Sequence, residues 1–94
     1  MILEWDPVKN QRLKQERGVC FDDIVIAIEE NRILDIAPHH NLKKYPNQLV
    51  LMVEITGYIY MVPFVIKNTE TIFLKTVFPH RKATRNYLIN KKKK

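Results

Sequence analysis

The sequence of 94 residues contains one cysteine, two glycines and five prolines. A single cysteine excludes a disulfide within the chain and a zinc site made of several cysteines. So little glycine and proline excludes a flexible linker, a collagen-like repeat and a low-complexity chain. The longest nearly apolar run, residues 49–66, is interrupted by Glu54, Gly57 and Pro63, which argues against a membrane helix and for two strands. The opening MILEWDP has no basic segment followed by an apolar stretch, so we expect no secretory signal and a soluble, cytoplasmic protein.

What the sequence does contain is an uneven distribution of charge. The net charge of +6 divides into −1 for residues 1–47 and +7 for residues 48–94. From Lys75 onward there are eight basic residues and no acidic one, and four of the eight are the lysines at 91–94. Such a segment can bind phosphates or an acidic partner. For residues 91–94 alone we expect a disordered tail beyond a single domain of residues 1–90, because like charges repel and do not pack.

A short strand at 2–5 and a helix are predicted at the start of the chain. Asp6 is typical of a helix N-cap, and Pro7 suits the first helical position because that position needs no N–H. The helix should run over residues 7–17 and end at Gly18, which adopts the left-handed conformation without strain.

A second helix is predicted to begin at residue 21, because apolar residues recur there at the spacing of one helix face. The residues of this face are Phe21, Ile24, Val25 and Ile28. Asp22 and Asp23 occupy the first turn, where the helix dipole favours negative charge. Cys20 is expected to be a small buried or capping residue, since nothing near it in the sequence would lower the pKa of a thiol.

Four strands are predicted to follow, at residues 33–37, 48–56, 58–67 and 71–78. Gly57 lies in the tight connection between the second and the third. Pro63 cannot donate to a neighbouring strand, so we expect it at a sheet edge or a bulge. In the last strand, simple alternation places Leu74 and Val77 on opposite faces. With a final helix over 81–90, the sequence predicts an α+β domain: an antiparallel meander with two N-terminal helices and one C-terminal helix, all packed on one face.

Two segments of the sequence carry a resemblance to a known family. The first comprises Glu4-Trp5-Asp6-Pro7, Lys9, Gly18-Val19 and Phe21-Asp22-Asp23, and it is similar to the opening of the BrnT toxin family. The second, Arg81-Lys82-Ala83-Thr84-Arg85, is similar to the segment that follows the last strand in that family. The chain departs from the family pattern at Arg17, where the family has a histidine, and in its apolar last strand, where the family is rich in arginine.

The resemblance implies a type II toxin with a RelE-like, microbial-ribonuclease-type fold. We therefore expect a metal-independent endoribonuclease without a cofactor, which cleaves RNA and inhibits translation. A cognate antitoxin is also implied, with a DNA-binding domain such as a ribbon-helix-helix, so that operator DNA is bound only through the antitoxin. The alternative is a non-catalytic module on the same fold that binds nucleic acid or a partner protein through its basic end.

Four residues around the end of the last predicted strand are the candidates for catalysis: Lys75, His80, Arg81 and Arg85. Cleaving RNA without a metal requires a base for the 2′-hydroxyl proton, a cation that stabilises the charged phosphorane and an acid for the leaving oxygen. Histidine can serve as acid or base near neutral pH, and arginine binds phosphate through a bidentate fork. Lys82 and Tyr87 are expected to contact RNA beside them. The alternative is a set of solvated residues at a helix N-terminus.

Two further groups are candidates for RNA contact. His39, His40 and Lys43 lie in a polar loop, and Lys9 and Arg12 lie on the first helix. The alternatives are an ordinary solvated loop and a solvated helix face. No cysteine or paired aspartate near the histidines completes a set of metal ligands, so no metal site is predicted.

Overall fold

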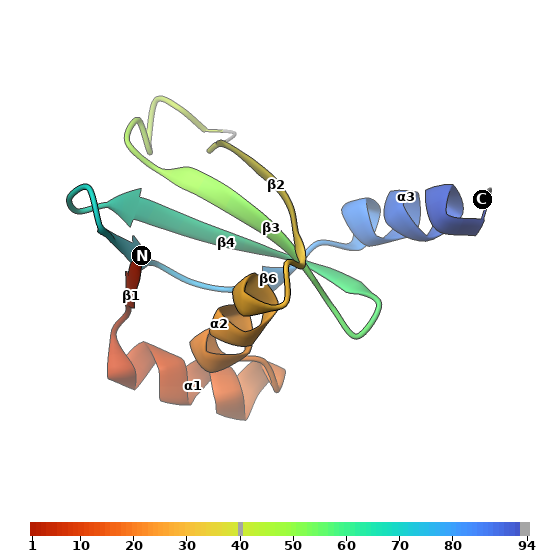
Figure 1. Ribbon diagram of the computed structural model, residues 1–94, viewed down its shortest axis with the longest axis horizontal. Coiled ribbons are helices and arrows are strands. Elements are labelled where there is room, and N and C mark those ends of the chain that lie inside the picture. The colour runs from red at the N-terminus through yellow and green to blue at the C-terminus, as the bar shows by residue number, and fades with distance from the viewer. Residues whose placement is uncertain (40, 93–94) are drawn as a thin grey trace.

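The structure is a computed structural model that describes residues 1–39 and 41–92 (Figure 1). Within these residues it contains three helices and a six-stranded sheet, which confirms the predicted α+β class. The elements are β1 (Ile2–Glu4), α1 (Pro7–Arg17), α2 (Phe21–Glu29), β2 (Ile33–Pro38), β3 (Leu49–Ile55), β4 (Tyr58–Ile66), β5 (Thr71–Leu74), β6 (Phe78–Pro79) and α3 (Arg81–Lys92). α3 thus continues into the segment 91–94 that the sequence predicts to be a tail. His40 and residues 93–94 lie outside the described residues, and the RNA contact expected of His40 stays a prediction.

The strands are ordered β1-β5-β4-β3-β2 across the sheet, and β6 pairs with β4 beyond the end of β5. The strands β2 to β5 form the predicted antiparallel meander. β1 pairs with β5 in parallel, so the sheet departs from a purely antiparallel arrangement at this edge. A tight turn imposes an antiparallel direction on the strands that it joins, whereas β1 and β5 are connected through most of the domain and can run the same way.

The local signals at the ends of α1 and α2 act as predicted. The Val8 N–H donates to Asp6 Oδ1 over 2.9 Å, and α1 ends at Gly18 with a φ of 70°. At the start of α2, Cys20 is buried, and its N–H donates to Asp23 Oδ2 over 2.9 Å. These bonds satisfy amide groups that would otherwise lack a partner at a helix start.

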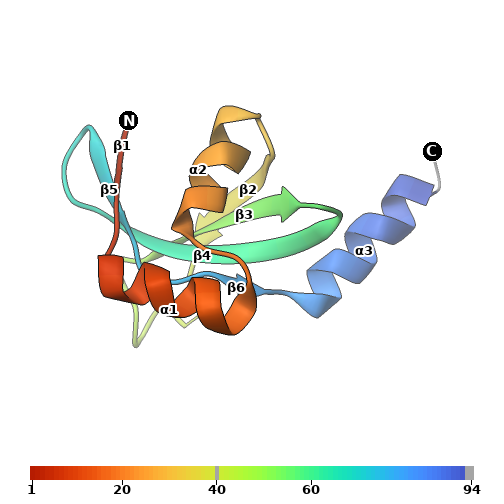
Figure 2. The same cartoon turned by 90° about the horizontal axis from the view of Figure 1, so that it is seen from below.

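The main core lies between the sheet and the pair α1–α2, which cover one face of it (Figure 2). Phe21 and Ile24 of α2 are fully buried there, and the ring of Trp5 stacks on Phe21 with a centroid distance of 5.6 Å. The sheet contributes alternate residues of its two longest strands: Leu51 and Val53 from β3, and Val62 and Phe64 from β4. The residues between them therefore face the other side of the sheet.

α3 does not share the face that α1 and α2 cover, which corrects the prediction that all three helices pack together. It projects from the end of the sheet (Figures 1 and 2). Among its described side chains Thr84 alone is buried, and Leu88 and Ile89 are 41% and 45% exposed. A helix with so narrow an apolar stripe has little to bury against a sheet. No helix in the described part of the chain is long and apolar enough to cross a membrane.

The two longest strands, β3 and β4, are joined by the tight turn that the sequence predicts. Thr56 and Gly57 form this turn, with φ values of 50° and 80°. Positive φ at both central residues is typical of the two-residue turn that matches the twist of a hairpin. β3 and β4 pair from Leu49 and Phe64 to Ile55 and Tyr58, so they form a continuous ribbon through the sheet.

The predicted strand 71–78 is interrupted, and its two parts, β5 and β6, pair successively with β4. Leu74 pairs with Phe64, and Phe78 pairs with Met61. Three residues between Leu74 and Phe78 therefore face two residues of β4, and the extra residue makes a β-bulge.

The bulge changes which side chains reach the core. Leu74 and Val77 are both fully buried, although simple alternation puts them on opposite faces, and that prediction is wrong. The sequence predicts Pro63 at a sheet edge or a bulge, and it lies opposite this bulge, in the central strand of the sheet. Its carbonyl accepts from the Lys75 N–H over 2.8 Å. The Arg17 guanidinium donates to the Val77 carbonyl, which ties the end of α1 to the bulge.

Candidate functional site

His80 links the sheet to α3 and forms the N-cap of that helix. Its N–H donates to the Ile59 carbonyl over 2.9 Å, and its carbonyl accepts from the Thr84 N–H over 3.0 Å. Its ring Nδ1 accepts from the Ala83 N–H over 3.0 Å. A nitrogen that accepts a hydrogen bond carries no proton, so the neutral ring holds its proton on Nε2. In this arrangement His80 can donate through Nε2 but cannot take up a proton on Nδ1 without losing the cap.

Thr84 fixes the first turn of α3 to the sheet. It is 4% exposed, and its hydroxyl accepts from the Ile59 N–H over 2.9 Å and donates to the His80 carbonyl over 2.8 Å. Ile59 is a fully buried residue of β4, and its N–H donates to Thr84 while its carbonyl accepts from the His80 N–H. The start of α3 is therefore held rigidly, while the rest of the helix extends away from the domain (Figure 1).

Three of the predicted site residues are exposed cations on the held end of α3: Arg81, Lys82 and Arg85. Arg81 and Arg85 are separated by four residues and can act on one side of the helix. None of the three has an ion-pair partner within residues 1–39 and 41–92. Cations at a helix N-terminus oppose the helix dipole, so an anion bound there would relieve the repulsion. Tyr87 lies farther along the same helix and is partly buried.

Lys75 is not brought together with these residues. Its backbone lies opposite Pro63 in the bulge, whereas the backbone of His80 lies opposite Ile59. Pro63 and Ile59 are four positions apart along β4, or about 13 Å at the rise of a strand. The Lys75 ammonium lies over the Phe73 ring, 5.5 Å from its centroid. Lys75 could therefore contact a neighbouring phosphate of an RNA, but not the phosphate held at the start of α3.

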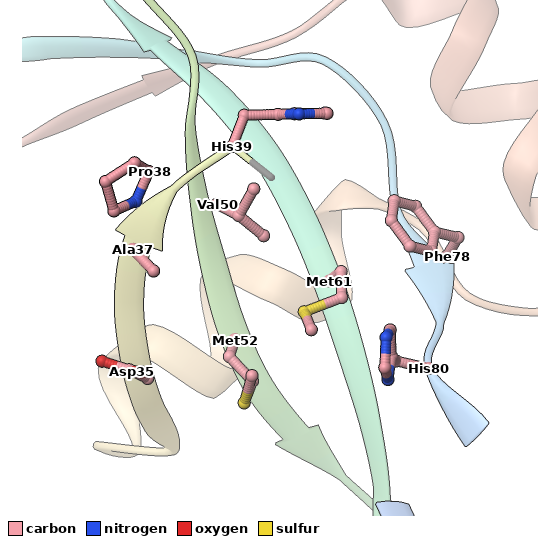
Figure 3. A pocket seen from close by; sticks show the side chains of 9 residues that line it. All are labelled: Asp35, Ala37, Pro38, His39, Val50, Met52, Met61, Phe78 and His80. Carbon is pink, nitrogen blue, oxygen red and sulfur yellow. The ribbon is translucent and has the colours of Figure 1, made fainter. Parts of the chain in front are cut away.

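The face of the sheet opposite α1 and α2, here called the cavity face, contains a cavity of about 330 Å³ (Figure 3). One row of register partners crosses its floor from β2 to β6: Asp35, Met52, Met61 and Phe78. The full lining consists of Asp35, Ala37, Pro38, His39, Val50, Met52, Met61, Phe78 and His80. Sequence analysis missed this cavity, although β3 and β4 are apolar at both odd and even positions, which indicates that neither face of the sheet is fully solvated.

His39 and His80 line opposite ends of this cavity (Figure 3). Pro38, the residue before His39, pairs with Leu49 of β3, which in turn pairs with Phe64 of β4. His80 is instead hydrogen-bonded to Ile59 of β4. Phe64 and Ile59 are five positions apart along β4, or about 16 Å. The two histidines therefore cannot act as the acid and the base on a single phosphodiester.

The other predicted RNA contacts are dispersed. Lys43 is exposed in the loop that follows β2. Lys9 is half-buried and Arg12 is exposed on α1, which packs on the face away from the cavity. Lys9 and Arg12 are therefore on the opposite side of the sheet from the cavity.

Two groups near α2 have shifted pKa values. Burial raises the pKa of the Cys20 thiol, which disfavours the reactive thiolate. The side-chain amide of Asn10 donates to Asp22 Oδ2 over 3.0 Å and lowers the pKa of that carboxyl. Across the residues that the structure describes, no three His, Cys, Asp or Glu side chains gather where they could hold a metal ion.

No protein-family model and no curated protein matches the sequence. The fold is similar to that in the crystal structure of the Brucella abortus ribonuclease toxin BrnT, with a TM-score of 0.60 and 18% sequence identity. The match covers 85% of this chain and 97% of that one. The resemblance to BrnT that the sequence indicates is therefore confirmed at the level of the fold.

Proposed function

We propose that this protein is the toxin of a type II toxin–antitoxin pair, an endoribonuclease that cleaves RNA, inhibits translation and is neutralised by a cognate antitoxin. The observation that carries the proposal is the likeness in fold to a ribonuclease toxin over 85% of the chain. The cationic start of α3 agrees with it, because Arg81, Lys82 and Arg85 present unpaired positive charge on a rigidly held turn.

The proposed roles follow from the geometry at this turn. Arg81 and Arg85 hold the reacting phosphate and stabilise the charge of the phosphorane. His80 donates a hydrogen bond to a phosphate oxygen through Nε2, because its Nδ1 is engaged by the Ala83 N–H. Lys82 and Tyr87 contact the RNA beside that phosphate. In this scheme water takes the 2′-hydroxyl proton and protonates the leaving oxygen. The residues accelerate the step without a metal ion, by orienting the phosphate and stabilising its charge.

The proposal extends to partners. The antitoxin would carry a DNA-binding domain such as a ribbon-helix-helix, and the toxin would reach operator DNA only through it. The complex would act in the cytoplasm, where its RNA substrate is found.

The test is cleavage of single-stranded RNA by the purified, antitoxin-free protein in the presence of EDTA. Arg81→Ala and Arg85→Ala should each lower the cleavage rate about 10²–10³-fold, the usual effect of removing one stabiliser of a developing anion. Lys14→Ala is the matched control, because Lys14 is an exposed cation on α1, on the far face of the sheet. Removal of lysines 91–94 should weaken RNA binding at low salt and leave the chemical step unchanged. Full activity in the double arginine variant would contradict the site assignment.

A non-catalytic RNA-binding module is the second candidate, and one observation favours it. Lys75, one of the four residues that the sequence marks for catalysis, lies about 13 Å along β4 from His80 and does not join the other three. A binding module would cleave neither free nor ribosome-bound RNA in any variant. Its affinity would fall by similar steps with each lost cation, and the slope of log affinity against log salt would flatten by about 0.7 for each contact to a single strand.

A further inference from the structure

The cavity face is an apolar surface that none of the described helices covers. α1 and α2 pack on the other face, and α3 projects from the end of the sheet (Figures 1 and 2). Val50, Met52, Met61 and Phe78 line the cavity, and its 330 Å³ is enough to take several apolar side chains (Figure 3). Methionine side chains adapt to partners of different shape and are common at surfaces that bind peptides.

We infer that this cavity receives an acidic, amphipathic peptide segment of a partner protein, with apolar side chains in the cavity and carboxylates against the cations at its two ends. In the proposed function that partner is the antitoxin, and its identity rests on that proposal. The chemistry of the docking segment rests on the cavity alone.

The acidic character follows from the charges around the cavity. At one end, His80 is followed directly by the unpaired Arg81. At the other end, the ring of Tyr45 lies 4.4 Å from that of His39, and the Lys44 ammonium lies 5.3 Å from the Tyr45 ring. An apolar centre between two positive ends is complementary to a segment whose apolar side chains are flanked by carboxylates.

Asp35 is the one carboxylate in the lining, and the cations Arg81 and Lys44 near the two ends outnumber it. Its Oδ1 already accepts from the Ile36 N–H over 2.8 Å. The same bond also affects the free edge of β2. The His39 N–H donates to the Gln48 carbonyl of the neighbouring chain segment, and alternate residues of a strand bond to the same neighbour, so the Ile36 N–H points away from β3. With that donor taken, and with Pro38 lacking one, the edge of β2 is poorly suited to adding a strand. Docking on the cavity face is favoured over docking on the edge.

Neither RNA nor a second copy of the chain fits this surface as well. RNA is recognised by stacking on aromatic side chains, whereas between its two histidines this cavity has methionine, valine and a single aromatic residue, Phe78. Two copies of the chain would bring together net charges of +6 each. Their mutual repulsion disfavours burying the cavity of one copy against another.

The three methionines of the chain allow a direct test with the full-length protein. Met52 and Met61 line the cavity, whereas Met1 is 77% exposed at the N-terminal end of β1 and serves as the internal control. The probe is a designed helical peptide with leucines at i, i+3, i+4 and i+7 and glutamates elsewhere. The control peptide has lysine in place of every glutamate. The acidic peptide should shift the methyl NMR signals of Met52 and Met61 and leave Met1 unchanged, and the lysine peptide should bind at least about tenfold more weakly.

Two pairs of variants complete the test. Met52→Asp should weaken acidic-peptide binding about tenfold or more, because it places a like charge in the apolar centre, whereas Val8→Asp on the exposed surface of α1 should not. Lys44→Glu, an exposed change that leaves the core intact, should also weaken binding, whereas Lys14→Glu on α1 should not.

Equal binding of both peptides, or no shift of the Met52 and Met61 methyl signals with either peptide, would overturn the inference. Tighter binding of an RNA oligonucleotide at the same methyls would also overturn it. So would a shift of these methyl signals with protein concentration that accompanies a doubling of mass in sedimentation. RNA cleavage is measured separately with the same wild-type sample. A protein that binds the acidic peptide at Met52 and Met61 but does not cleave RNA would refute the proposed function and leave the inference standing.

Discussion

Substitution of His80 by asparagine and by alanine separates two roles of this residue, one in holding α3 and one in contacting RNA. Asparagine is among the best N-cap residues and can accept the Ala83 N–H in place of Nδ1, whereas alanine cannot. His80→Ala should therefore destabilise the start of α3 by about 1 kcal/mol, and His80→Asn by a few tenths at most. Both variants lack the imidazole Nε2–H that the proposed function places on the phosphate.

The loss in His80→Ala should be local, because the hydrogen bonds that join His80 and Thr84 to Ile59 lie in the first turn of α3. Hydrogen exchange of the Ala83 amide measures it directly, since a change of about 1 kcal/mol corresponds to a roughly fivefold faster exchange. The Ala83 amide should be equally protected in wild type and His80→Asn, and should exchange about fivefold faster in His80→Ala. The amides of Leu51 and Val53, in the middle of the sheet, serve as the control and should exchange equally in all three proteins.

RNA cleavage gives the second readout of the same pair. If Nε2 acts on the phosphate, His80→Asn should keep the protection of Ala83 and still lose about 10²–10³ in rate. Wild-type cleavage by a well-protected His80→Asn protein would refute the chemical role and leave His80 as a positioning residue alone. Loss of Ala83 protection in His80→Asn would refute the reasoning about the cap itself.

The remaining predictions concern stability. Thr84→Val should destabilise the protein by about 1–3 kcal/mol in urea denaturation, because it leaves the buried Ile59 N–H without its acceptor; a change below about 0.5 kcal/mol would show that water replaces the hydroxyl. Thr56→Asn should stabilise the protein by about 1 kcal/mol, because threonine is strained at a φ of 50° and asparagine tolerates it; a lower melting temperature would contradict this reading of the turn. The raised pKa of Cys20 implies that its neutral thiol contributes stability that is fully present below the ordinary thiol pKa and is lost as the pH rises through the higher folded-state value. Cys20→Ala should therefore lose less stability than wild type between neutral and alkaline pH, and parallel pH curves would argue against the shift.

The features that could be predicted from the sequence are those determined by residues a few positions apart. Asp6 and Gly18 delimit α1 through bonds and angles within a single turn of chain. Gly57 marks the hairpin for the same reason, since the turn needs only two residues of suitable conformation. The cations at the start of α3 were also visible, because Arg81 and Arg85 are close in sequence and share a helix.

The features that could not be predicted depend on contacts between distant residues. The bulge before β6 arises where β4 changes partner, and nothing within residues 71–78 distinguishes it from a continuous strand. Lys75 and His80 face β4 positions that are four residues apart, so Lys75 stays away from the group of His80, Arg81 and Arg85 at the start of α3. The cavity is likewise a product of register across four strands, and its row from Asp35 to Phe78 is not apparent in any one segment.

The contacts made by the two ends of the fold affect the order in which a growing chain can acquire structure on the ribosome. β1 cannot pair within the sheet until β5 has been synthesised. Arg17, at the end of α1, cannot form its hydrogen bond until the Val77 carbonyl has been synthesised. The apolar face of α2 can associate early with β3 and β4, but it remains incompletely covered until Leu74 and Val77 emerge. The nascent chain should therefore stay sensitive to proteases through most of its translation and become resistant in a single late step.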